Sequence, residues 1–154
     1  MTQSGLRPIC VGCKLTNPMA PIPADVLIVD DDEPTQTFLR AMTRRLGFAA
    51  QCVGDGETAK LHLDGNHPWR VILLDLYLPK CDGFDVIAFM RKNAPFLLAH
   101  TIVVTAAGER DMNLIRKQPL IHCVLRKPID INELAAHMAE CAGIPAPNLH
   151  AETT

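Results

Sequence analysis

The chain has 154 residues, of which 48% are hydrophobic and 21% charged, a composition typical of a globular protein with one hydrophobic core. Its formal net charge of −2 and isoelectric point of about 6.3 argue against a broad nucleic-acid-binding surface. It contains neither an apolar run long enough to cross a bilayer nor the compact apolar stretch of a secretory signal peptide, so we expect a cytoplasmic protein without a membrane partner.

Both ends of the chain lack the periodicity of folded segments. Glycine and proline interrupt residues 1–23, which predicts a flexible extension, and residues 144–154 predict a short flexible tail. Met19 offers an alternative translation start. Cys10 and Cys13 have C-x-x-C spacing, but without a second pair or a nearby histidine we favour an inert pair over a zinc or redox site.

Between these ends, apolar segments alternate with segments of helical periodicity. The segments expected to form strands are residues 25–30, 48–53, 70–75, 101–105 and 121–125. The segments expected to form helices are residues 34–46, 56–65, 83–93, 109–117 and 130–142. The alternation predicts one α/β domain over residues 24–143, a doubly wound five-stranded parallel sheet with helices on both faces.

Local signals support individual elements of this prediction. Asp32 or Glu33 can cap the first helix, and Pro34 follows at an early position that tolerates proline. The third strand contains "VILLDL", which is apolar for four residues running. Such a run is expected of a central strand that is buried on both faces.

Polar residues follow four of the predicted strands, where binding sites form in open parallel sheets. They are Asp30, Asp31 and Asp32 after the first strand, Asp75 after the third, Thr105 at the end of the fourth and Lys127 after the fifth. Each residue alone has an ordinary explanation as a helix cap, turn residue or surface charge. None of these separate explanations accounts for the fact that all of these residues follow strands at the same edge of the sheet. We therefore predict a functional site at that edge.

The chemistry of such a site follows from its charges. Clustered carboxylates repel one another, and a divalent cation relieves the repulsion without protonation. Hard oxygen ligands favour Mg²⁺. A carboxylate beside Mg²⁺ can attack phosphorus to give an acyl phosphate, which requires a fixed cation and a hydrogen-bond donor around the transferred group. Lys127 can be the cation and Thr105 the donor.

With these residues in view, the sequence resembles a receiver domain of the two-component response regulators over about residues 24–143. The motifs that carry the resemblance are "VDDD" after the first strand, "DLYLPKCDG" from Asp75 to Gly83, Thr105–Ala106 and Lys127–Pro128. The resemblance implies a flavodoxin-like topology with strand order 2-1-3-4-5. It also implies that the Lys127–Pro128 peptide bond is cis.

The resemblance assigns a role to each residue of the predicted site. Asp75 would be the phosphoacceptor. The ligands of Mg²⁺ would be Asp30, Asp31, Asp75 and the backbone carbonyl of Tyr77. Thr105 would bind the phosphoryl group and drive the switch, and Lys127 would pair with that group.

One position departs from the family pattern. Receivers often carry an aromatic residue three positions before the lysine, where this chain has Val124. We therefore expect the switch to run through Thr105, the loop after it and the helix at 109–117. A second hypothesis concerns Tyr77, whose ring would border the attacking water and slow hydrolysis of the phosphoryl group.

The resemblance also implies partners. A sensor histidine kinase or a phosphotransfer protein would supply the phosphoryl group, and a downstream protein would read it at residues 109–117, 121–125 and 130–142. No DNA-binding pattern follows the domain, so we expect a stand-alone receiver without direct DNA contact. On this surface, we expect the apolar residues to belong to the core rather than to the interface: they are Leu114, Ile115 and Met138.

Three alternatives stay open. A degenerate receiver would act only as an interaction module. An aspartyl-nucleophile phosphatase of the haloacid dehalogenase type would use Asp30 and Asp32, although Pro34 departs from that pattern and no cap domain is present. A redox role for the cysteines ranks last, because none lies beside an activating group.

Overall fold

The computed structural model describes residues 25–145; the expectations for residues 1–23 and 146–154, for Met19 and for the pair Cys10 and Cys13 lie outside them. The predicted tail begins too early, because Ile144 packs against the core and its amide donates to the Ala139 carbonyl at 2.9 Å. Strands and helices alternate along these residues. The strands are β1 (Val26–Val29), β2 (Ala50–Val53), β3 (Val71–Leu74), β4 (Thr101–Thr105) and β5 (Cys123–Arg126). The α-helices are α1 (Glu33–Arg45), α2 (Gly56–Leu63), α3 (Gly83–Asn93), α4 (Glu109–Arg116) and α5 (Ile131–Ala142), and a 3₁₀ helix spans Pro95–His100.

The strands form one parallel sheet in the order β2-β1-β3-β4-β5. This order confirms both the predicted doubly wound sheet and the implied topology. In the register, Val26 of β1 aligns with Ala50 of β2 on one side and with Val71 of β3 on the other. The chain leaves β1 toward one edge and β3 toward the other, so the gap between their carboxyl ends is the topological switch point where ligands bind.

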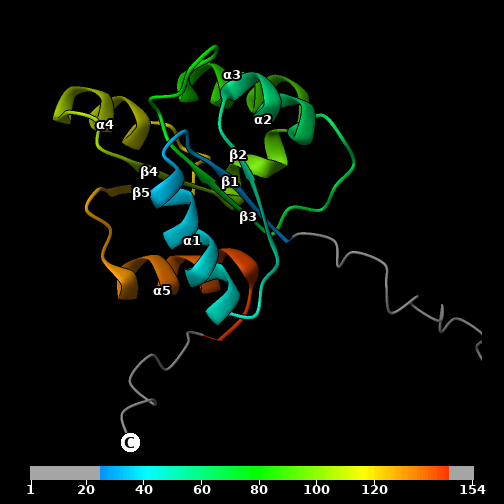
Figure 1. Ribbon diagram of the computed structural model, residues 1–154. Coiled ribbons are helices and arrows are strands. Elements are labelled where there is room, and N and C mark those ends of the chain that lie inside the picture. Colours follow the sequence, from blue (N-terminus) through cyan, green and yellow to red (C-terminus); the bar gives the residue numbers. More distant parts are fainter. Residues whose placement is uncertain (1–24, 146–154) are drawn as a thin grey trace, which may run out of the picture.

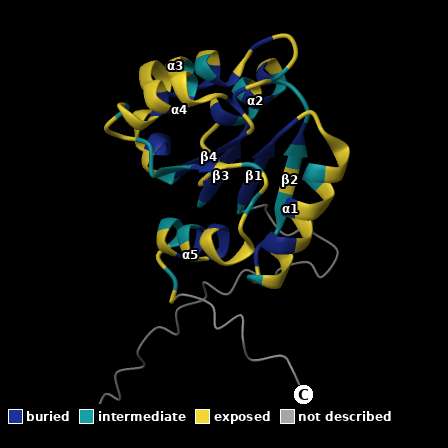
Figure 2. Cartoon of the chain, turned by 90° about the vertical axis from the view of Figure 1, so that its left-hand side faces the viewer, coloured by how far each residue is buried: buried dark blue, intermediate teal, exposed yellow. Residues whose placement is uncertain are grey.

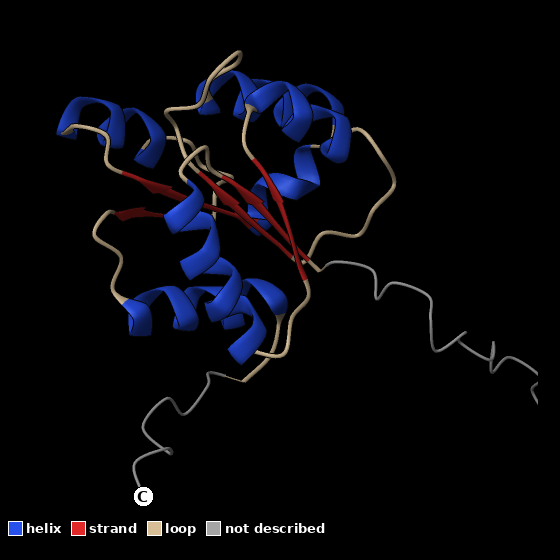
Figure 3. Ribbon diagram, in the orientation of Figure 1, coloured by secondary structure: helices blue, strands red, loops and turns tan. Residues whose placement is uncertain are grey.

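Helices cover both faces of the sheet, α1 and α5 on one and α2, α3 and α4 on the other (Figures 1 and 3). Strand residues alternate between these faces. Val26 and Ile28 pack in the core with α1 and α5, while Leu27 and Val29 pack in the core with α2, α3 and α4. Each face of β1 therefore needs apolar residues, which explains its unbroken apolar run.

Burial decreases from the centre of the sheet to its edges (Figure 2). Every residue of β1, β3 and β4 is buried, whereas β2 and β5 contain half-buried and exposed residues. The apolar segment at 71–74 is buried on both faces, as predicted. The polar groups at the ends of β1 and β3 therefore adjoin the most buried part of the sheet.

Several element boundaries differ from the sequence predictions. Strand β2 begins two residues late because Gly47, with φ of +84°, ends helix α1 and the Phe48 amide bonds back to the Thr43 carbonyl at 3.0 Å. The 3₁₀ helix at Pro95–His100 was not predicted, since its short apolar run has no clear period. Within it, Leu97 and Leu98 are buried.

The prediction for the apolar residues of α4 and α5 is partly wrong. Ile115 and Met138 lie in the core as expected, but Leu114 is 47% exposed. Leu114 follows the buried Met112 by two positions, and this spacing turns it away from the sheet on a helix of 3.6 residues per turn.

None of the helices within residues 25–145 has the length and hydropathy that a helix crossing a bilayer requires.

Candidate functional site

The two aspartates that follow β1 and β3 lie side by side at the switch point. The Asp30 amide donates to the Val53 carbonyl at 3.1 Å, and the Asp75 amide donates to the Val29 carbonyl at 2.9 Å, so both residues continue the sheet ladder. Their exposed fractions are only 2% and 7%. Two neighbouring buried carboxylates are unfavourable unless positive charge accompanies them.

Lys127, which follows β5, supplies that charge. Its Nζ donates to Asp30 Oδ2 at 2.7 Å and to Asp75 Oδ2 at 2.9 Å. The Lys127 amide also donates to the Thr105 carbonyl at 2.9 Å, which places the lysine backbone beside the end of β4. The Lys127–Pro128 peptide bond is cis, as the resemblance implies.

Asp31 and Asp32 have different surroundings from Asp30. Asp31 is exposed, and its carboxylate lies with those of Asp30 and Asp75 in a group whose oxygen atoms are all within 4.8 Å of one another. Asp32 caps α1, because its Oδ2 accepts from the Thr35 amide at 2.9 Å. The three consecutive aspartates therefore differ in their surroundings. Asp30 is buried, Asp31 is exposed and is the third carboxylate of the group, and Asp32 caps α1.

Thr105 lies at the predicted edge but is fully buried. Its hydroxyl oxygen accepts from the Ala107 amide at 3.2 Å, so the side chain orders the turn that leads to α4. Four of the predicted residues, Asp30, Asp31, Asp75 and Lys127, are thus in one cluster, and Thr105 joins it through its backbone bond to Lys127.

The loop after β3 holds Asp75 in place. The Tyr77 amide donates to Asp75 Oδ1 at 3.2 Å, while the Tyr77 ring is 53% exposed. The Tyr77 hydroxyl donates to Asp111 Oδ2 at 2.8 Å, and this bond raises the pKa of the phenol. The site loop is therefore connected directly to the first turn of α4, a contact that sequence reasoning missed because 34 residues separate the two.

Two further residues that sequence reasoning did not single out support the site. The Gln36 side-chain amide on α1 donates to the Asp30 carbonyl at 2.5 Å. A Cβ atom on Gly83 would lie 2.4 Å from the Asp75 carbonyl oxygen, so no side chain fits there. The sequence contained a signal for this close approach, because the motif that begins at Asp75 ends with Asp82–Gly83, and glycine in a motif often marks a place where two backbone segments lie close together.

The pKa values follow from burial and from the lysine. Desolvation raises the pKa of Asp30 even though Lys127 and the Asp32 amide lower it. For Lys127, burial lowers the pKa, but the hydrogen bonds to Asp30 and Asp75 outweigh it and raise the pKa above its ordinary value. Lys127 is thus a fixed cation, while Asp30 is a carboxylate whose charge is incompletely compensated.

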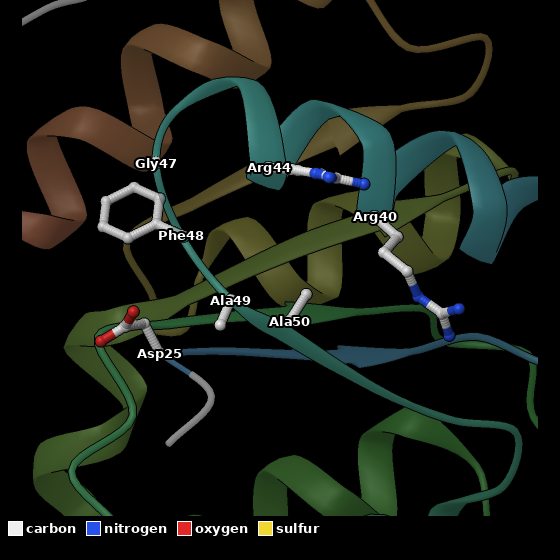
Figure 4. A pocket seen from close by; sticks show the side chains of 7 residues that line it. All are labelled: Asp25, Arg40, Arg44, Gly47, Phe48, Ala49 and Ala50. Atoms are coloured by element: carbon white, nitrogen blue, oxygen red, sulfur yellow. The ribbon is translucent and has the colours of Figure 1, made fainter. Parts of the chain in front are cut away.

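A larger hollow elsewhere does not belong to this site (Figure 4). It has a volume of about 430 Å³ and is lined by Asp25, Arg40, Arg44 and residues 47–50. Asp25 precedes β1, so this hollow lies at the opposite end of the strand from Asp30. A smaller hollow of about 320 Å³ adjoins the site and is lined by Pro34, Thr35, Phe38, Lys127, Pro128 and Ile129.

A parallel sheet with three carboxylates at its switch point, two of them bonded to a lysine after the last strand, places the chain among the doubly wound α/β domains with an acidic site. The family model for the response regulator receiver domain matches residues 26–139. The chain belongs to this family of two-component signalling domains. Membership confirms the family on which the sequence resemblance rested.

The chain is similar to curated regulators of different lengths. It is 31% identical over 112 residues to a probable chemotaxis protein CheY of Rhizobium etli, covering 72% of this chain and 86% of that protein. It is 30% identical over 113 residues to the transcriptional regulatory protein QseB of Haemophilus influenzae, covering 73% of this chain and 50% of that protein. The chain therefore matches only half the length of the second relative.

Solved structures show the same fold. One is the receiver domain of a sensor histidine kinase from Pseudomonas aeruginosa, with a TM-score of 0.67, 28% identity, and coverage of 79% of this chain and 99% of that one. That structure contains a magnesium ion coordinated in its active-site cleft. A sensor protein from Polaromonas has the same TM-score of 0.67 and 28% identity, with coverage of 77% and 94%.

Proposed function

We propose that the chain is a phosphorylation-dependent receiver that accepts a phosphoryl group on Asp75 in a Mg²⁺-dependent reaction. The observation that carries the proposal is the pair of hydrogen bonds from Lys127 Nζ to Asp30 and Asp75. A purely structural ion pair would need one carboxylate, whereas here the lysine holds two, beside a third that is exposed to solvent. The arrangement leaves excess negative charge at an accessible edge.

The residues fit a magnesium ion. Asp30, Asp31 and Asp75 carry three negative charges against the single charge of Lys127, so a divalent cation would balance the group. Neighbouring ligands of an octahedral Mg²⁺ lie about 3 Å apart, given bond lengths of about 2.1 Å, so the carboxylates, now within 4.8 Å, need only modest closure. The Tyr77 carbonyl would be a further ligand. When bound, Mg²⁺ neutralises charge on the transferred phosphoryl group.

The chain's own residues would then carry out the transfer. An Asp75 carboxylate oxygen attacks phosphorus, the bond from phosphorus to the donor breaks, and the product is an acyl phosphate. Lys127 moves from Asp75 Oδ2 to the new phosphoryl oxygens. Thr105 would exchange its bond with the Ala107 amide for one to the same group, which would displace the turn before α4.

The output would run through α4. No aromatic ring is available at half-buried Val124, so the ring rotation common in the family is absent. Two connections lead from the site to this helix: the Thr105–Ala107 turn and the Tyr77–Asp111 hydrogen bond. We infer that a protein partner reads the surface of α4, β5 and α5, where Leu114 is exposed.

Members of this family interact with histidine kinases, and we infer that such a kinase or a phosphotransfer protein is the donor. The 320 Å³ hollow next to Lys127 offers a contact surface, because Phe38 is 37% exposed there beside Pro128 and Ile129. A donor protein that reaches Asp75 would cover these apolar groups. DNA contact is not part of the proposal.

The test is intact mass after incubation with acetyl phosphate, with and without Mg²⁺. We expect a Mg²⁺-dependent gain of one phosphoryl group in the wild type and in Asp64→Asn, a control at an exposed carboxylate outside the site. Asp75→Asn should gain none. If none of the proteins gains the mass of a phosphoryl group, the proposal is wrong. The degenerate receiver, which acts as an interaction module without phosphorylation, would then be favoured.

The phosphatase alternative has lost support. It required Asp32 as a catalytic residue, but this side chain is committed to the Thr35 amide and hydroxyl as the cap of α1. Sustained turnover of a generic phosphomonoester such as p-nitrophenyl phosphate would restore that alternative.

A further inference from the structure

A second group of metal-ligating side chains lies between β5 and α5. His122 precedes β5, Cys123 is its first residue and His137 lies in α5. One ligand atom from each of the three lies within 4.8 Å of the other two. The histidine rings meet edge to face with centroids 5.5 Å apart. These residues take no part in the proposed phosphoryl transfer.

The histidine nitrogens in this group are buried without hydrogen bonds. Neither His122 Nε2 nor His137 Nδ1 has a hydrogen-bond partner among the described residues. Glu140, one turn after His137, brings its Oε2 to 3.4 Å from His122 Nε2 and 3.6 Å from His137 Nδ1. Buried polar atoms are nearly always satisfied, so two converging nitrogens that have only these long contacts to one carboxylate oxygen point to a further partner.

We propose that His122, Cys123 and His137 bind one transition-metal ion of the Zn²⁺ class. Glu140 completes a four-coordinate site as the oxygen ligand. Two imidazole nitrogens, one thiolate and one carboxylate match the ligand preferences of zinc and not those of magnesium. The site goes beyond the proposed receiver function and does not depend on it.

The geometry needs a small adjustment to close around an ion. With bond lengths of about 2.0–2.3 Å, ligand atoms of a tetrahedral zinc lie about 3.3–3.8 Å apart. The present spread of up to 4.8 Å therefore closes by about an ångström, within the reach of side-chain rotation. Glu140 is not among the three residues within 4.8 Å, but it is 69% exposed and already contacts both histidines, so it would turn inward to become the fourth ligand.

The thiol must lose its proton on binding. Burial raises the pKa of Cys123 to about 12, so the sulfur is a neutral thiol in the metal-free chain. A bound zinc ion replaces this proton, which is released to solvent, and the sulfur becomes a thiolate ligand. The same burial makes a redox role for this cysteine unfavourable.

An ordinary polar cluster is the competing explanation, in which Glu140 contacts both histidines. That explanation gives Cys123 only a packing role, as a small apolar side chain against the core between the sheet, α1 and α5. The metal site uses all four groups. It also connects α5 to edge strand β5, at a distance of about 13 Å from Lys127, since four residues of extended strand separate Cys123 from it.

The test uses metal-free full-length chain carrying Cys10→Ser and Cys13→Ser, which removes the C-x-x-C pair, in excess Mg²⁺. Titration with Co²⁺ should saturate at one ion per chain with a thiolate-to-cobalt charge-transfer band, and one equivalent of Zn²⁺ should abolish this band. Cys123→Ser should eliminate the band. His137→Gln and Glu140→Gln should each weaken Zn²⁺ affinity about tenfold or more.

Matched controls separate this site from others. Cys52→Ser, at a half-buried cysteine on β2, should leave the band and the affinity unchanged. Far-ultraviolet circular dichroism and a cooperative thermal unfolding transition should show that each variant is folded. Absence of the band in the parent chain overturns the proposal, and so does a band that survives Cys123→Ser. Should Cys123→Ser not fold, unchanged affinity in the surface variant Glu140→Gln and in His137→Gln overturns it equally.

Discussion

Lys127 is the residue on which the electrostatics of the site depend most. It is the one cation that the described residues place within hydrogen-bond distance of Asp30 and Asp75. We expect Lys127→Met to lower the free energy of unfolding by about 1–3 kcal/mol in the absence of Mg²⁺, because it leaves two buried carboxylates uncompensated. Urea denaturation measures this change. Added Mg²⁺ should recover part of the loss.

The matched control is Lys80→Met. Lys80 pairs with Asp55 at 3.2 Å, but its side chain is 66% exposed. An exposed pair of this kind contributes less than about 1 kcal/mol. Equal losses in the two variants would contradict the special role assigned to Lys127.

Tyr77 tests whether the ring or its hydroxyl acts on the phosphoryl group. Tyr77→Ala removes the shielding ring, and we expect it to shorten the lifetime of the phosphorylated protein by about 2- to 10-fold, a change of at most about 1.4 kcal/mol in activation free energy. Tyr77→Phe removes only the bond to Asp111 and should keep the wild-type lifetime. Decay followed by intact mass measures both. An unchanged lifetime in Tyr77→Ala removes the shielding hypothesis.

For single residues, the sequence identified the site residues that follow strands, but it missed contacts that come from other parts of the chain. Asp30, Asp75 and Lys127 were predictable because parallel strands bring their carboxyl ends together. The Tyr77–Asp111 bond joins two loops whose approach no local pattern encodes. The exposed position of Leu114 was missed because an apolar residue on a surface helix normally indicates the buried face.

Among the secondary-structure elements, α2 offers a test of helix capping. Asp55 caps it, and hydrogen bonds from Thr58, the backbone amide first, lower the pKa of the carboxyl. A carboxyl whose pKa is lower in the folded state stabilises the fold above its unfolded pKa of about 3.8 and loses this effect as pH falls through the folded value.

We therefore expect Asp55→Ala to lower the melting temperature at neutral pH. The difference from wild type should shrink as pH falls below about 3.8. Thermal unfolding followed by circular dichroism across this range checks the prediction, and a difference that does not vary with pH would show that the charge of the cap is unimportant.

The start of α3 tests the packing of the loop that follows Asp75. A Cβ on Gly83 would lie 2.4 Å from the Asp75 carbonyl and 2.7 Å from the Leu76 Cα, and backbone cannot yield as a side chain can. We expect Gly83→Ala to destabilise the protein by about 1–3 kcal/mol and to slow phosphorylation. Gly65→Ala is the control, because its Cβ would meet no atom nearer than 4.0 Å. Chemical denaturation and the acetyl phosphate reaction measure the two effects.

Element types were predictable, whereas their ends were less so. The alternation of apolar and amphipathic segments determined the order of strands and helices, because each type has its own period. The late start of β2 depended on the turn at Gly47, and the 3₁₀ helix depended on packing of Leu97 and Leu98 under the sheet. The first depends on a local helix-ending turn whose exact position the hydrophobic period does not show, and the second on tertiary contacts that a local pattern does not contain.

For the molecule as a whole, magnesium should act as a stabilising ligand. A ligand that binds only the folded state, at about 100 times its dissociation constant, adds about 2.7 kcal/mol to the free energy of unfolding. We expect Asp31→Asn to abolish most of this gain with little cost to the metal-free fold, since Asp31 is exposed. Denaturation with and without Mg²⁺ measures it. Asp64→Asn should retain the full Mg²⁺-dependent gain. An equal loss of this gain in both variants would show that Mg²⁺ does not bind at Asp31.

The long separations within the site have a consequence for how the protein forms. Lys127 bonds to Asp30 and Asp75, which lie 97 and 52 positions earlier in the chain, and it follows β5, the last strand in sequence. During synthesis, the two acids therefore emerge long before their cation does. Under the proposed function, the site would be complete only when β5 has docked. Phosphorylation during refolding would then report formation of the whole domain rather than collapse of its centre.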